Sequence, residues 1–316
     1  MKGIALKKNV KNLHSVKRNR LLFYSLFISI PVLHFLVFYV YINFNSVLLA
    51  FQEYHLADVG GFQAAFAGFS NFATAWKELF SRAYLIWDSL IFLAVDLFIV
   101  TPLALLFSYY LYKKGFMSGF FKIILFMPQL LSSVILGLLF KYVATDVYLW
   151  FADAAGAKVT GGLLDNANTS LITMIVFNVI MGFGVNVLLF VGAMSGVNSS
   201  LIESAQLDGA NIMQEFWYIV LPMIFPTVAT VMIISISHLF TNQAHLYTMY
   251  GNGAGQLGTV GYFMYIQAME SKLVAPTSNL LSYPVLSAMG LILTAIILPI
   301  TMVLRHLMNK YGPSVD

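Results

Sequence analysis

Cysteine and charge are the scarce features of this 316-residue sequence. The absence of cysteine excludes disulfides, thiolate metal sites and cysteine nucleophiles. Only 9% of the residues are charged, whereas an ordinary soluble domain has about 25%. Apolar residues make up 59% of the chain, and its mean hydropathy is +0.82. A soluble fold cannot bury that much apolar surface, so the sequence predicts an all-α integral membrane protein.

Six apolar runs are long enough to cross a bilayer, because a helix needs about 20 apolar residues to span roughly 30 Å of hydrocarbon. The second run carries Asp88 and Asp96, the third carries Pro128, and none of the six contains Lys or Arg. The spans are expected at Leu21–Tyr41, Tyr84–Leu111, Ile123–Phe140, Ser170–Met194, Val220–Phe240 and Val285–Leu304.

Lysine and arginine predict the orientation, because basic residues near spans remain on the cytosolic side. With the amino terminus inside, twelve of the 17 basic residues are cytosolic and both termini face the cytosol. The first run is too long for a cleaved signal peptide and is expected to be retained as a span. Four parts follow: a basic cytosolic tail at 1–20, the first span with an external segment at 21–83, a core of five spans at 84–310, and a cytosolic tail at 311–316.

The external segment at 50–81 is rich in aromatic residues. It is too polar to span and too aromatic for a free linker. We expect either a cap near a docking partner or a belt of rings lying on lipid headgroups.

The connection between spans four and five is acidic although it falls on the cytosolic side. It contains Glu203, Asp208 and Glu215 and no base. Two capping patterns, Ser200 with Glu203 and Asn211 with Gln214, flank the turn dipeptide Asp208-Gly209. These signals predict a helix–turn–helix over 200–217. An apolar stripe is expected along it, formed by Ile202, Ala205, Gly209, Met213 and Phe216.

The same connection carries a longer motif that ends at the start of span five, where Pro222 suits a first helical turn. Its residues, Glu203-Ser204-Ala205, then Gly209, then Ile219-Val220-Leu221-Pro222, resemble the EAA signature of the membrane subunits of bacterial ABC importers. Ser204 replaces the first alanine of that signature. Residues 125–140 and the glycine-rich segment 250–259 are similar to the maltose-type, oligosaccharide-uptake branch of the type I importers.

This resemblance implies a coupling helix between spans four and five that docks on a separate ATPase. The coupling residues it implies are Glu203, Ser204, Ala205, Asp208, Gly209, Ala210, Leu221 and Pro222. The implied partners are two copies of an ABC ATPase, a second homologous permease subunit and an extracellular solute-binding protein. Phe216 and Trp217 are expected to anchor the loop, and its surface acids to meet basic residues of the ATPase.

The chain itself is not expected to be an enzyme or to hold a cofactor. It has no G-x-x-x-x-G-K-[ST] phosphate loop, so ATP and Mg²⁺ are expected on the partner ATPase. His238 and His245 do not make a metal site without a third ligand. No nucleic-acid partner is expected. The resemblance places the protein in a bacterial cell membrane, crossing it several times.

Polar side chains inside the bilayer are functional candidates, because each is costly there. Asp96, Asn178 and Asn186 either tie helices together by hydrogen bonds or line a path for a sugar. A polar and aromatic cluster at the outer end of span five, His238, Asn242, Gln243 and Tyr247, is the preferred sugar-binding group, or else a boundary anchor. The lack of basic residues in the expected spans favours a neutral solute.

Three other functions compete with import of an oligosaccharide. A secondary transporter would use Asp96 to bind the coupling ion, but no internal repeat or matched pair of broken helices is visible. An ABC permease for another small solute stays open. A membrane-embedded enzyme has little support, because no H-E-x-x-H or G-x-S-x-G motif occurs.

Overall fold

The computed structural model describes residues 20–56, 62–255, 257–271 and 280–313. The predicted basic tail at 1–20 lies outside them apart from Arg20, and so does the end of the C-terminal tail, residues 314–316. Six of the described helices are long and apolar enough to cross a membrane: Arg20–Ala50, Ala83–Tyr112, Ser133–Ala154, Ala167–Ser195, Ile212–Ser237 and Tyr283–Tyr311. The predicted all-α membrane fold with six spans is confirmed.

Several spans contain short π-helical segments (η) within continuous helix. The successive segments of the spans are η1 (Leu36–Tyr41) and α2 (Ile42–Ala50) in the first, α4 (Ala83–Val95), η2 (Asp96–Val100) and α5 (Thr101–Tyr112) in the second, α7 (Ser133–Tyr142), η3 (Val143–Val147) and α8 (Tyr148–Ala154) in the third, α9 (Ala167–Ser195) in the fourth, α11 (Ile212–Glu215), η4 (Phe216–Val220) and α12 (Leu221–Ser237) in the fifth, and α15 (Tyr283–Tyr311) in the sixth.

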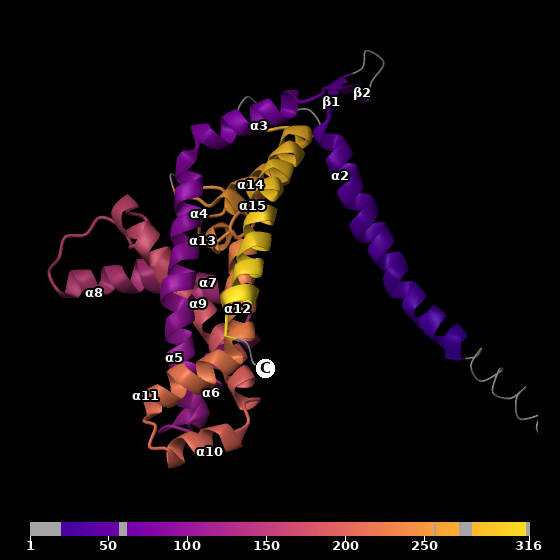
Figure 1. Ribbon diagram of the computed structural model, residues 1–316. Coiled ribbons are helices and arrows are strands. Elements are labelled where there is room, and N and C mark those ends of the chain that lie inside the picture. The colour runs from indigo at the N-terminus through magenta and orange to yellow at the C-terminus, as the bar shows by residue number, and fades with distance from the viewer. Residues whose placement is uncertain (1–19, 57–61, 256, 272–279, 314–316) are drawn as a thin grey trace, which may run out of the picture.

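Shorter elements connect these spans. They are β1 (Gln52–Leu56), β2 (Phe62–Phe66), α3 (Ser70–Ser81), α6 (Ser118–Leu130), α10 (Ser199–Leu207), α13 (Leu246–Tyr250) and α14 (Val260–Glu270). The two strands form an antiparallel hairpin with register Gln52 to Phe66 and Leu56 to Phe62. In Figure 1, α3 crosses one end of the bundle, whereas α10 and α11 lie at the opposite end.

The third span differs from the prediction. The run expected as one helix over Ile123–Phe140 is broken, because α6 ends at Leu130 and Leu131 is extended. Pro128 removes an N–H near the end of α6, and the Ser132 hydroxyl accepts a hydrogen bond from the Val134 amide to cap α7. By length and hydropathy, the third span is therefore Ser133–Ala154.

The observed bounds of the third span place a different set of charged residues within the membrane spans than the sequence predicted. Lys141 now lies within it, so the statement that no span contains Lys or Arg is wrong. Its ammonium donates to the Met249 carbonyl oxygen at 2.9 Å, which gives the charge a hydrogen-bond partner within the protein.

Pro222 also differs from its expected place. It does not open span five, because a continuous helix already runs from Ile212. The π-helical segment η4 directly precedes it. A local π turn accommodates the missing N–H and the proline ring, as it does at η2 before Pro102.

Apolar side chains form three buried clusters that hold the bundle together. One joins α5, α9, η4 and α12 around Phe190, Met194 and Phe216. A second joins α3, α4 and α15, and a third surrounds Phe177 on α9 together with α13. Gly184 is needed where α9 meets α6, because a Cβ there would lie 2.6 Å from the Leu125 carbonyl oxygen.

Candidate functional site

A cavity of about 400 Å³ lies where the second, fourth and fifth spans meet the break between α6 and α7. We call it the central cavity. Asp96, which lines it, is near the middle of the span Ala83–Tyr112. The polar residues that line the central cavity are Ser89, Asp96, Gln129, Ser133, Asn178, Ser235, His238, Asn242, His245 and Thr259.

The cavity is bordered by the irregular parts of the spans. Asp96 opens the π-helical segment η2, Leu131 lies in the break between α6 and α7, and Gln129 and Ser133 flank that break. Backbone that is not regular helix is tolerated at membrane depth where it is buried in protein or lines a cavity. His238 ends α12, and the chain there turns back through two residues with positive φ, Ala244 and His245.

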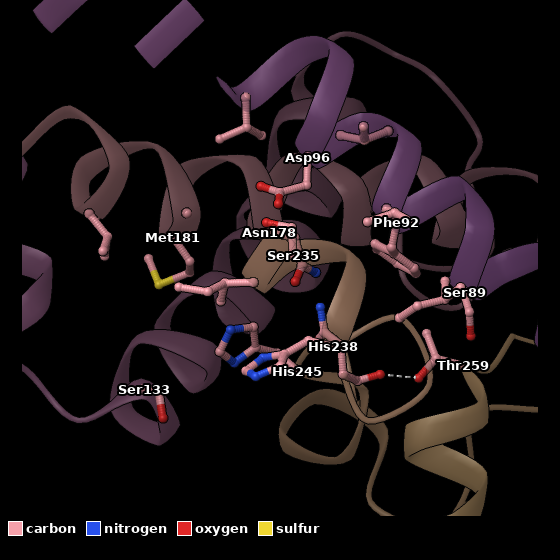
Figure 2. Close-up of a pocket in the computed structure, with 18 of the residues that line it drawn as sticks. Ser89, Phe92, Asp96, Ser133, Asn178, Met181, Ser235, His238, His245 and Thr259 are labelled. Carbon is pink, nitrogen blue, oxygen red and sulfur yellow. Dashed lines mark hydrogen bonds between the residues drawn. The ribbon is translucent and has the colours of Figure 1, made fainter. Parts of the chain in front are cut away.

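Asn178 connects α9 to this turn. Its side-chain amide donates to the Met174 carbonyl oxygen at 2.8 Å and to the Ala244 carbonyl oxygen at 2.9 Å. Thr259 holds the other side, where its hydroxyl donates to the Asn242 carbonyl oxygen at 2.7 Å (Figure 2). These bonds use the donors of Asn178 and leave its carbonyl oxygen as an acceptor toward the cavity.

Two imidazoles and one carboxylate face one another across this space. Figure 2 shows His238 and His245 on one side and Asp96 on the other, with Asn178 and Ser235 between them. Burial lowers the pKa of His245, so its ring is neutral at pH 7 and offers one donor and one acceptor. Its ring also meets Phe177 edge-on at 5.3 Å.

Among the described residues, Asp96 is the one acidic side chain that lines the cavity. No lysine or arginine is among its lining residues in the described chain. The bond expected from Asp96 to a neighbouring Asn or Ser is not formed in this structure, and no partner of its carboxylate is found among the described residues. Asp96 therefore has its acceptor oxygens available to a polar molecule.

Four of the seven predicted path residues meet in the cavity and three do not. Asp96, Asn178, His238 and Asn242 line it. Asn186, Gln243 and Tyr247 lie elsewhere, and the Tyr247 ring packs edge-on against Tyr265 at 4.9 Å. His245, Ser235 and Ser133 were not among the predicted path residues. His245 reaches the cavity through the turn after α12, and Ser133 reaches it through the break before α7. No local sequence pattern indicates either feature.

A second region is formed by α10 and its flanks, residues 196–211, which we call the α10 loop. Asn198, not the predicted Ser200, caps α10, because its side-chain oxygen accepts from the Ser200 amide at 3.0 Å. The predicted box of Asn211 with Gln214 is present and starts α11. The second helix of the predicted pair is thus the beginning of span five.

The turn after α10 needs its glycine. Gly209 has φ +84°, its amide donates to the Gln206 carbonyl oxygen at 3.1 Å, and the Ala210 amide donates to that of Ala205 at 2.9 Å. This pair of bonds is a Schellman motif, which requires a left-handed residue at the position of Gly209. The Asp208-Gly209 turn is confirmed.

Glu215 differs most from its prediction. It was grouped with the surface acids of the loop, but only 1% of it is exposed. Its carboxylate accepts from the Lys113 ammonium at 2.7 Å, the Tyr109 hydroxyl at 2.9 Å and the Gln206 side-chain amide at 3.1 Å. These partners belong to the end of span two and to α10, so Glu215 joins the α10 loop to two spans.

The remaining side chains of the α10 loop, and those at the start of span five, divide between the core and the surface. Ile202 and Phe216 are buried, and Phe216 packs on the Tyr109 ring at 4.9 Å. Met213 is exposed, so the predicted single stripe is wrong. Trp217 is exposed as well, so of the two predicted anchors Phe216 alone is buried. Glu203, Ser204, Asp208 and Gly209 are exposed, Ala205 and Ala210 are half-buried, and Leu221 and Pro222 lie inside span five.

Comparison with known proteins places the larger part of the chain in one family. Residues 100–315 match the family described as binding-protein-dependent transport system inner membrane component. The arabinooligosaccharides transport system permease protein AraP of Bacillus subtilis is 28% identical over 303 residues, 92% of this chain and 91% of the relative. The starch degradation products transport system permease protein AmyD (a probable assignment) of Thermoanaerobacterium thermosulfurigenes is 26% identical over 69% of this chain and 73% of its own.

A solved structure has the same fold. A chain from the crystal structure of a bacterial ABC transporter involved in the import of the acidic polysaccharide alginate matches with a TM-score of 0.69. It is 20% identical, and the match covers 95% of this chain and 99% of that one.

Proposed function

Because the chain belongs to the family of binding-protein-dependent transport system inner membrane components, we propose that it is a permease subunit of an ATP-driven importer of a neutral oligosaccharide. The observation that supports this choice of solute is the lining of the central cavity. Among the described residues, that lining has many hydrogen-bonding groups and no lysine or arginine. The relatives named for arabinooligosaccharides and for starch degradation products support the same class of solute.

The central cavity suits a molecule with many hydroxyl groups. A sugar hydroxyl both donates and accepts, and it meets acceptors at Asp96 and Asn178 and the ring nitrogens of His238 and His245. Phe92 and Met181 add apolar surface for the C–H faces of a sugar ring. Asn186, Gln243 and Tyr247 are proposed to act along the path outside this cavity.

The α10 loop is the proposed docking surface for an ATPase subunit. Around it, apolar side chains are exposed at Leu207, Ile212 and Met213, beside the carboxylate of Glu203. Exposed apolar residues rimmed by polar ones are typical of a protein contact. The residues proposed to couple are those of the EAA-like motif, Glu203 to Ala210, with Leu221 and Pro222 transmitting their movement into span five.

The other components follow from this assignment. ATP and Mg²⁺ would be bound by two ATPase copies, and a second permease would complete the path. An extracellular binding protein would deliver the sugar at the end of the bundle opposite α10. The α10 loop and both chain termini are proposed to face the cytosol.

Two experiments test the proposal. Gentle affinity purification of the tagged chain from its own membranes, with mass spectrometry, should recover a second permease, an ATPase present in two copies and a binding protein. Uptake of a labelled oligosaccharide by the reconstituted complex should require ATP. Purification of the chain alone, with uptake driven by an ion gradient, would refute the proposal.

One pair of variants distinguishes the proposed ATP-driven permease from an ion-coupled carrier. Gly209→Glu should abolish uptake, because it strains the Schellman turn and adds charge at the docking surface. Asp96→Asn should retain ion-independent uptake with altered affinity. A carrier that used Asp96 for its coupling ion would show the reverse pattern.

A further inference from the structure

The helix α3 divides into three longitudinal sectors, and one of them is a stripe of exposed rings. We call Phe69, Trp76 and Phe80 the ring stripe. Residues four or seven apart share a helix face. Trp76 and Phe80 are in ring contact at 4.7 Å, and the exposed fractions of the three residues are 73%, 50% and 56% in chain order.

The other two sectors differ sharply from the ring stripe. Asn71, Ala75 and Leu79 are buried, and Ala75 and Leu79 pack in the cluster shared with α15. The third sector is polar and exposed, and it consists of Ser70, Thr74, Lys77 and Ser81. A helix with a protein-facing, an apolar and a polar sector is suited to the boundary between protein, hydrocarbon and water.

Both ends of α3 are tied to the ends of membrane spans. At its start, the Asn71 side-chain amide donates to the carbonyl oxygens of Ala50 at 3.0 Å and Gln52 at 2.8 Å, and Ala50 ends the first span. At its other end the chain passes through Arg82 into the second span at Ala83. In Figure 1 α3 runs across the bundle between these two spans. Its depth is therefore that of the lipid headgroups.

The exposed rings continue onto the exposed surface of α4, the first part of the second span. The next aromatic residues of the chain, Tyr84 and Trp87, are 40% and 66% exposed in the first turns of this span. Arg82, at the corner, is held by an ion pair with Glu78 and lies over the Phe263 ring at 5.1 Å. The corner between α3 and α4 is thus fixed, and the ring stripe adjoins the exposed aromatic surface of a membrane span.

We propose that the ring stripe of α3 inserts into the headgroup and upper acyl region of one leaflet, making α3 an interfacial lipid anchor that fixes the outer ends of the first and second spans. The occupant is lipid, because continuity with the surface of α4 and the position at the span ends both place the rings at the boundary where aromatic side chains gather. The polar sector with Lys77 faces water.

Fluorescence quenching by brominated lipids tests this proposal. The tagged chain, with the subunits that purify with it, is reconstituted in vesicles of phosphatidylethanolamine and phosphatidylglycerol that contain phosphatidylcholine brominated in the upper acyl chain. The variants Trp87→Phe, Trp150→Phe and Trp217→Phe together leave Trp76 as the emitting tryptophan of this chain, and signal from other subunits is removed by subtracting a Trp76→Phe sample.

We expect the bromines to remove about half of the Trp76 emission, because an interfacial ring lies about 5–10 Å into the boundary. Lipid brominated near the acyl terminus should quench it less. The matched control moves the tryptophan to the polar sector, as Thr74→Trp with Trp76→Phe, and should show little quenching by either lipid. A sample that keeps Trp87 instead is the positive control.

Equal quenching at positions 74 and 76 would overturn the proposal, because it would remove the sector dependence. Trp76 emission that bromine does not quench would also overturn it, and addition of the binding protein would then help to identify why the rings do not contact lipid. A change of Trp76 emission on adding the binding protein would show a protein contact there, and unquenched emission without such a change would show that the rings lie in water or against another permease subunit.

Discussion

Removing the positive partner of Glu215 should destabilise the protein more than neutralising Glu215 itself. Lys113→Met leaves a carboxylate that is 1% exposed with only the Tyr109 and Gln206 donors. Breaking a buried ion pair from one side costs about 3–5 kcal/mol. Because the Lys113 side chain is 28% exposed, water compensates in part, and we expect the low end, about 3 kcal/mol.

Glu215→Gln should cost less, about 1–2 kcal/mol, since a neutral amide leaves no buried charge and Lys113 can turn toward water. The double variant Lys113→Met with Glu215→Gln should be more stable than Lys113→Met alone. The energies of the two single changes then fail to add by about 1–2 kcal/mol, as expected for residues in contact.

The assay is thermal unfolding of the purified complex in lipid nanodiscs, followed by intrinsic fluorescence. A loss of 3 kcal/mol corresponds to a fall in melting temperature of roughly 6 °C or more for a chain of this size class. Lys114→Met is the matched control, because it removes the neighbouring exposed charge, which has no ion-pair partner among the described residues. An unchanged melting temperature for Lys113→Met, or no rescue in the double variant, would refute the reasoning.

Three further predictions concern the cavity and the turns. His238→Ala should weaken the apparent affinity for the oligosaccharide in a transport assay by about ten-fold, the effect of losing roughly 1.4 kcal/mol of hydrogen bonding, whereas Asn186→Ala, outside the cavity, should change it little. Asn178→Leu should lower the melting temperature as well as uptake, because it removes the bond to the Ala244 carbonyl oxygen that holds the turn after α12. Gly261→Ala should impair folding, since its Cβ would lie 2.6 Å from the Thr241 carbonyl carbon, while Gly192→Ala, which meets nothing, should be tolerated; equal expression and melting of the two would contradict the close approach.

Local signals in the sequence were reliable where the chemistry is local. The box of Asn211 with Gln214 and the left-handed Gly209 were predicted from neighbouring residues, because a cap or a turn is satisfied within a few residues. The capping of α10 was assigned to Ser200 rather than Asn198, an error of two positions at a helix end.

The third span shows where a hydropathy pattern fails. The run contains Pro128, but an apolar run has the same hydropathy whether it forms one helix or two helices that meet at a break. The break is tolerated because it lines a cavity, and that cavity is formed together with three other spans. For the same reason Lys141 appeared to lie outside the membrane.

Composition and short motifs by themselves determined the membrane class, the number of spans and the family, because the hydrocarbon imposes apolar length and the α10 loop keeps its motif at fixed spacing. Tertiary structure alone decided which polar groups meet. Asp96, Asn178 and His245 come from three separate parts of the chain, and Glu215 finds Lys113 from a distance of 102 residues. Such pairings have no spacing rule along the chain, because burial and the need to satisfy each charge select them only after the spans have packed.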